Sequence, residues 1–205
     1  MTPILANTLV DLFHKGGPIM WPIICVCITA IAIIAERSWW WLQLARSRRL
    51  DLLDQVLTQL DQGNADQAQQ LSSNASDPAL RVLHAGITHR HASITSALQA
   101  AASIEIKQAG RFLTAMDTII TLAPLLGLLG TVTGIMGSFQ SIGGSELAVE
   151  KVTGGIGEAL IATAFGLGIA IVTLIPYNYF HAKVASLQHD IETAASNLEV
   201  IASKS

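Results

Sequence analysis

The sequence predicts an all-α membrane protein with three transmembrane helices per subunit. Two observations predict this class. Hydrophobic residues make up 51% of the 205 residues and charged residues only 13%, whereas the surface of a soluble domain of this size needs more charge. Three stretches without a charged residue are also long enough to cross a hydrocarbon core, which takes about 20 helical residues. They are residues 19–35, a window within 118–145, and residues 159–180.

The first stretch is predicted to be an uncleaved membrane anchor over residues 19–42, preceded by an outer segment of residues 1–18. A signal peptide carries positive charge before its apolar region, but here only Lys15 precedes that region. Other positive charges follow it, at Arg37, Arg46, Arg48 and Arg49. Because positively charged segments stay on the cytoplasmic side of a membrane, we expect the N-terminus outside and the next segment in the cytoplasm.

The distribution of Lys and Arg predicts the same orientation along the whole chain. One lies before the first span, eight between the first and second spans, one between the second and third, and two in the tail. Aromatic residues, which prefer the membrane interface, lie near the ends of the spans: Trp21, Trp39, Trp40, Trp41, Tyr177 and Tyr179. We therefore expect the C-terminus in the cytoplasm.

The cytoplasmic segment, residues 43–111, is predicted to be helical. Apolar residues at helical spacing run from Leu50 to Leu60, and Gly63 ends that helix. Asp77 followed by Pro78 is typical of a helix start. No strand signal is visible, and the segments outside the membrane are too small to form a catalytic domain. The sequence therefore predicts a protein that is not an enzyme.

The second and third spans are predicted to belong to long helices that continue into the cytoplasm. The Ala-rich sequence after Ser93 runs into the second span and predicts one helix from about Ser93 to Gln140. Gly154–Gly157 predicts a turn before the third span. The remaining boundaries are 112–140 for the second span, 141–156 for the outer loop, 157–180 for the third span and 181–205 for a helical tail.

A polar stripe runs along the second span. Residues seven apart drift by only about 20° around a helix, so Asp117, Pro124, Thr131 and Ser138 share one side, which Thr121 joins. Polar side chains are costly on a helix face that contacts lipid. The stripe therefore meets either other protein or water, although each Thr hydroxyl can also bond to its own helix backbone. Pro124 predicts a local bend, as a tolerated kink or a hinge.

Small residues predict close helix packing. Gly130 and Gly134 in the second span are four apart, and Ala162, Gly166 and Ala170 in the third continue that spacing. The two spans of one subunit could use these faces on each other. The surplus of small residues also favours self-association.

Other functions are disfavoured by composition. The net charge of −3 leaves no basic surface for nucleic acid. His89 and His91 are two residues apart and do not face one way on a helix, so we predict no metal site and no cofactor. The middle of each span lacks an Asp, Glu, His, Lys or Arg. If protons cross the membrane here, another chain must bring the group that carries them.

Four passages lie in or around the spans: Met20–Pro22 with Ile34–Trp39 around the first, Ala123–Met136 in the second, Gly157–Ala164 opening the third and Ile175–Asn178 closing it. Together they resemble the MotA/TolQ/ExbB proton-channel family, most closely its ExbB and TolQ branch. The segment 43–111 is far smaller than in flagellar MotA proteins, so a flagellar role is not expected.

The resemblance implies a homopentameric ring in the bacterial inner membrane, with a periplasmic N-terminus. Its second and third spans would line a pore around an ExbD/TolR-like dimer, whose single spans carry the proton-binding Asp. It also implies pore-facing hydroxyls at Thr131 and Thr163 and a carboxylate near the outer pore entrance at Glu158. Proton flow would then energise a TonB- or TolA-like protein. The alternative is a non-conducting membrane scaffold that assembles partner proteins.

Overall fold

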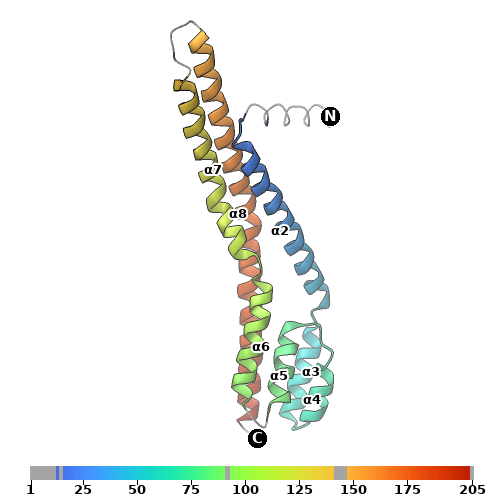
Figure 1. The fold of residues 1–205 in the computed structure, drawn as a ribbon. Coiled ribbons are helices and arrows are strands. Elements are labelled where there is room, and N and C mark those ends of the chain that lie inside the picture. Colours follow the sequence, from blue (N-terminus) through green and yellow to red (C-terminus); the bar gives the residue numbers. More distant parts are fainter. Residues whose placement is uncertain (1–12, 14–15, 91–92, 141–146, 204–205) are drawn as a thin grey trace. The chain divides into compact units, whose positions relative to one another are not determined.

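The computed structural model describes residue 13 and residues 16–90, 93–140 and 147–203 (Figure 1). In these residues every regular element is an α-helix, which confirms the predicted class. The helices are α2 (Met20–Ser47), α3 (Leu50–Asp61), α4 (Ala65–Ser72), α5 (Pro78–Thr88), α6 (Ile94–Ala109), α7 (Leu113–Gln140) and α8 (Leu147–Ala202).

Three helical stretches in the described residues are long and apolar enough to cross a membrane: Met20–Ser47, Ile94–Phe139 and Val152–Ala202. They correspond to the three predicted spans. Together with their composition, they show a multi-pass membrane protein. The continuation of α8 far beyond Tyr179 is also as predicted.

The chain divides into two compact units. The first contains Met1–Ala35 and Phe112–Asn178, and the second contains Glu36–Arg111 and Tyr179–Ser205. In the first unit, α7 lies beside the N-terminal part of α8 (Figure 1). The start of α2 packs on α8 through a small apolar core of Met20, Ile23 and Ala162.

The second unit is built from α3 to α6, the end of α2 and the C-terminal part of α8. Its core takes Leu80, Leu83 and Val82 from α5, together with Leu187 and Ile191 from α8. The side chain of Asp77 accepts a 2.9 Å hydrogen bond from the backbone N–H of Ala79, which caps α5. This cap, with Pro78 as the first helical residue, explains the helix start that the sequence indicated.

An ion pair joins α5 to α6 within this unit. Nε of Arg81 donates a 2.8 Å hydrogen bond to Oε1 of Glu105. The hydrogen-bonded carboxylate raises the pKa of the Arg81 guanidinium above its usual value. The ion pair cross-links the two helices.

The predicted single helix from Ser93 to Gln140 is wrong. It is divided into α6 and α7 at Gly110–Phe112, where Phe112 adopts φ +67°. That left-handed conformation cannot continue an α-helix. The residues after Gly63, within the segment predicted to be helical, form α4.

The predicted turn at Gly154–Gly157 is also wrong, because α8 already begins at Leu147. Gly155 serves close packing instead, since a Cβ there would overlap the Ser138 hydroxyl of α7. Some of the predicted features lie outside the described residues: residues 1–12 and 14–15 of the outer segment 1–18, His91, and residues 141–146 of the outer loop 141–156.

Candidate functional site

The two hydroxyls predicted to face a pore both bond to carbonyl groups in one turn of α7. Oγ1 of Thr163, on α8, donates a 2.9 Å hydrogen bond to the carbonyl oxygen of Gly127. Oγ1 of Thr131 donates a 2.6 Å hydrogen bond to the carbonyl oxygen of Leu128. Both threonines are half-buried in the single chain. Hydroxyls from two helices are therefore anchored on consecutive carbonyl groups.

Glycines allow α7 and α8 to approach closely enough for this contact. A Cβ on Gly127 would lie 2.9 Å from Cα of Thr163, and a Cβ on Gly130 would lie 2.5 Å from Cβ of Ala162. Both distances are shorter than real Cβ contacts. Any side chain at these glycines would therefore push the helices apart.

The same contact continues along both helices. A Cβ on Gly134 would lie 3.2 Å from Cβ of Ala159, and a Cβ on Gly166 would overlap the carbonyl oxygen of Ala123. Ala170 is also buried. The structure thus places all five of the small residues singled out in the sequence at buried or closely packed positions: Gly130, Gly134, Ala162, Gly166 and Ala170.

The polar stripe of α7 divides into three parts in the structure. Asp117 and Thr121 are exposed, while Pro124 and Thr131 are half-buried at the edge of the α7–α8 contact. Ser138 is buried, and its hydroxyl donates a 2.8 Å bond to the carbonyl oxygen of Gly134. Ser138 thus packs against α8, in a different environment from the rest of the stripe.

Most threonine hydroxyls of the spans bond to their own helix. Thr121, Thr133 and Thr173 each donate to a carbonyl three or four residues earlier, as Thr131 does. These are the bonds that a lone Thr in a membrane helix usually makes. Of the threonines singled out in the sequence, Thr163 alone donates to a different helix in the described structure.

Glu158 lies against the turn that precedes α2. Gly17 has φ +70°, and a Cβ there would collide with the Glu158 carboxylate. Any other residue would have a strained backbone at this φ and would displace the Glu158 carboxylate. Glu158 is half-buried, so the carboxylate at the start of the third span lies beside the chain just before the first.

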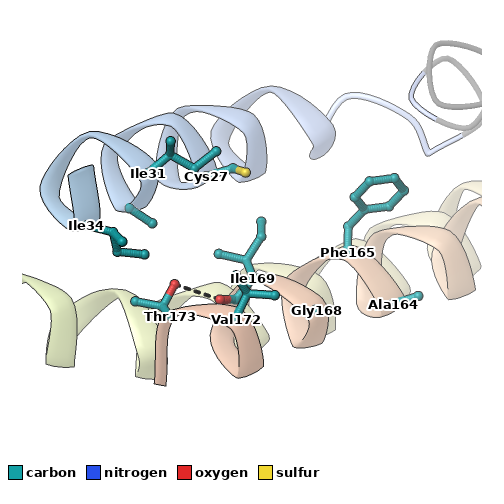
Figure 2. A pocket seen from close by; sticks show the side chains of 10 residues that line it. Cys27, Ile31, Ile34, Ala164, Phe165, Gly168, Ile169, Val172 and Thr173 are labelled. Carbon is teal, nitrogen blue, oxygen red and sulfur yellow. Dashed lines mark hydrogen bonds between the residues drawn. The ribbon is translucent and has the colours of Figure 1, made fainter. Parts of the chain in front are cut away.

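An apolar cleft separates α2 from α8 in the same unit (Figure 2). Its volume is about 350 Å³, and Cys27, Ile31 and Ile34 of α2 face Phe165 and Ile169 of α8. Its ten lining residues include no Asp, Glu, His, Lys or Arg. The dashed bond in Figure 2 joins the Thr173 hydroxyl to the Ile169 carbonyl, 2.7 Å away. This surface is suited to packing with apolar groups rather than to proton chemistry.

Two residues of the helix contact were not predicted from the sequence to pack between the helices. Gly127 accepts the Thr163 bond, and Gly155 packs on Ser138. The period of small residues could have found both. Gly127 lies three residues before Gly130, and Gly155 lies four residues before Ala159, so both fall at the spacing of three or four that places residues on one helix face.

Comparison with known proteins agrees with this geometry. The family described as the MotA/TolQ/ExbB proton channel family matches residues 74–193, which is more than half of the chain. The ExbB-like 1 biopolymer transport protein of Synechocystis sp. is 36% identical over 94% of this chain and 78% of its own length.

Two further relatives carry the same kind of name. The ExbB-like 3 biopolymer transport protein of Synechocystis sp. is 38% identical over 82% of each chain. The biopolymer transport protein ExbB of Xanthomonas campestris is 33% identical over 84% of this chain and 78% of its own length. The chain therefore belongs to the MotA/TolQ/ExbB proton channel family, in its ExbB branch.

Proposed function

We propose that this chain is the stator subunit of a motor driven by the proton-motive force in a bacterial inner membrane. Five copies would surround an ExbD/TolR-like dimer of single-span chains, with N-termini in the periplasm and C-termini in the cytoplasm. Proton flow through the complex would energise a TonB- or TolA-like protein that spans the periplasm.

The observation that carries the proposal is the convergence of Thr131 and Thr163 on the carbonyls of Leu128 and Gly127. Each hydroxyl uses its proton in that bond. Its oxygen lone pairs remain available as acceptors, so a ring of such pairs from several subunits could order water along a pore.

The distribution of acids supports a second chain inside that ring. Between Thr118 and Gln140 of α7, and between Ala159 and Phe180 of α8, the sequence holds no Asp, Glu, His, Lys or Arg. Threonine hydroxyls can guide water, but they do not titrate near neutral pH. A proton-binding carboxylate at mid-membrane depth must therefore come from a partner.

The exposed apolar surface supports self-association within the membrane. Leu125, Leu128 and Met136 of α7 and Leu160 and Ile175 of α8 are each more than half exposed in the single chain. The small residues of α7 and α8 pack against each other. A large apolar surface is therefore left for lipid and for neighbouring subunits.

The proposal is tested by substituting threonines by valine in chains co-expressed with an ExbD-like partner. Thr131→Val and Thr163→Val should each lower partner-dependent proton flux into proteoliposomes several-fold. Thr133→Val is the matched control, because Thr133 lies on the same helix two residues from Thr131, about 200° around it, and bonds only to its own backbone. Its flux should equal that of the wild type.

One observation favours the scaffold alternative. Five threonine hydroxyls of the spans already have an intramolecular acceptor: Thr121, Thr131, Thr133, Thr163 and Thr173. If the protein is a non-conducting scaffold, one of two results is expected. Either Thr131→Val and Thr163→Val show the same proton flux as Thr133→Val, or no proton flux depends on the partner. Either result, obtained with assembly intact by native mass spectrometry, would refute the channel and leave the scaffold.

A further inference from the structure

A polar pocket lies at the end of α2, entirely within the second unit. Its volume is about 410 Å³, which lies within the range of small-molecule sites. Arg46 from the last turn of α2 and Arg49 from the link to α3 form part of its wall. Most of its other polar lining comes from the segment after α4, with Ser73, Asn74, Ser76 and Asp77. We call it the arginine pocket.

The two arginines of the pocket are available to a ligand. Both are exposed, and neither forms an ion pair with a carboxylate among the residues that the structure describes. Their neighbour Arg48 differs, because it forms a 2.8 Å ion pair with Asp190 of α8. Arg46 and Arg49 therefore present two guanidinium groups, whose planar donor sets match phosphate oxygens.

The one acid of the pocket is already engaged by backbone groups. The carboxylate of Asp77 accepts hydrogen bonds from the N–H of Ala79 at 2.9 Å and from the N–H of Arg49 at 3.4 Å. Asp77 is only 5% exposed, and Arg81 lies near enough to be influenced by its charge. The positive potential of the pocket wall is therefore only partly cancelled.

The position of the pocket along α2 matches the depth of lipid headgroups. Trp39, Trp40 and Trp41 lie in the last turns of α2, and such rings prefer the membrane interface. Arg46 follows Trp41 by five residues, which is about 7.5 Å along a helix. The headgroup region extends several ångströms beyond the hydrocarbon core, so this spacing puts Arg46 near the expected depth of lipid phosphates, and Arg49 lines the same pocket.

We propose that the arginine pocket binds the phosphate group of an anionic phospholipid from the adjoining leaflet. Arg46 and Arg49 supply the charge, and Asn74 and Ser76 supply neutral donors for the remaining oxygens. The same chemistry would fit a free phosphate, but the depth beside the interfacial tryptophans favours a lipid source. The proposal does not depend on proton conduction.

The test compares lipid retention by full-length variants. The protein is reconstituted in phosphatidylcholine bilayers that contain a minority of phosphatidylglycerol, and native mass spectrometry then measures the phosphatidylglycerol retained after release into detergent. Arg46→Gln with Arg49→Gln should reduce retention several-fold. Lys107→Gln with Lys183→Gln is the control, because it removes the same charge from exposed residues outside the pocket.

A second variant tests the pocket without removing an arginine. Ala75 also lines it, so Ala75→Glu should expel the phosphate by like-charge repulsion and reduce retention to the level of the double variant. Circular dichroism checks that each variant remains helical.

Two outcomes would overturn the proposal. One is phosphatidylglycerol retention by the double arginine variant equal to that of the control pair. The other combines two results. Inorganic phosphate or glycerol phosphate raises the melting temperature of the lipid-free wild type but not of the double variant, and the wild type retains no lipid selectively. That second outcome would assign the pocket to a soluble phosphate. Lipid retention that depends on both arginines, with no shift by soluble phosphate, supports the lipid.

Discussion

The hydroxyl of Thr163 donates a 2.9 Å hydrogen bond across the helix interface to the carbonyl oxygen of Gly127. The bond is possible only because residue 127 is glycine, since a Cβ there would lie 2.9 Å from Cα of Thr163. A backbone carbonyl in a helix already accepts one bond from its own helix. Its second lone pair is used here to fix α8 against α7.

Thr163→Val removes this bond while keeping the shape of the side chain. We expect the free energy of unfolding in detergent to fall by about 1 kcal/mol, the usual net value of one hydrogen bond. Thr163→Ser keeps the donor and should remain within half of that loss. Equal melting temperatures for the valine variant and the wild type would show that the bond contributes nothing to stability.

Gly166→Ala should separate α7 and α8. The added Cβ would overlap the carbonyl oxygen of Ala123 and lie 3.1 Å from Cα of Gly127, and neither backbone can yield without moving a helix. Overpacking of this kind costs about 1–3 kcal/mol, measured as a lower midpoint of thermal unfolding.

The matched control for that substitution is Gly168→Ala, two residues further along α8. A Cβ there meets no atom within 4 Å, and alanine favours a helix over glycine. Its stability should equal or exceed that of the wild type. A loss as large as that of Gly166→Ala would mean that helix contact is not the cause.

The spans and several helix ends could be predicted from the sequence because their signals are local. Apolar length defines a membrane helix, and Asp77 with Pro78 forms a cap by itself. The Thr163–Gly127 bond joins residues 36 apart. Its existence depends on the register of two helices, which no local pattern contains.

Glycine caused the clearest error for a related reason. Gly63 has φ +80° and ends a helix, whereas Gly155 lies inside α8 and serves close packing. The residue type is the same, and only the neighbouring helix distinguishes the two uses. The break before α7 escaped detection because Phe112, a residue that rarely adopts positive φ, carries it.

The stability of variants at Phe112 should depend on how well the new residue tolerates positive φ rather than on its size. Asparagine and valine both remove the aromatic ring, but asparagine tolerates the left-handed region whereas β-branched valine does not. At φ +67° we expect Phe112→Asn to be more stable than Phe112→Val by about 1 kcal/mol. Thermal unfolding monitored by circular dichroism measures the difference, and the reverse order would argue that residue 112 adopts an ordinary helical conformation.

Arg37→Met should be the most destabilising of these single substitutions. Arg37 is only 1% exposed. Its guanidinium donates to both carboxylate oxygens of Glu36 and, at 3.2 Å, to the carbonyl oxygen of Gln108 near the end of α6. Methionine fills the space but leaves these acceptors without their donor, which costs about 1.5–3 kcal/mol for bonds to a charged group.

Arg37→Lys separates charge from geometry at the same position. A lysine keeps the positive charge but cannot donate to both carboxylate oxygens and the Gln108 carbonyl from one planar group. Its melting temperature should therefore lie between those of the wild type and Arg37→Met. The control Lys107→Met removes a positive charge from an exposed position of α6 and should change little. If Arg37→Lys is as stable as the wild type, charge alone accounts for the contribution of residue 37 and the bond to α6 contributes nothing.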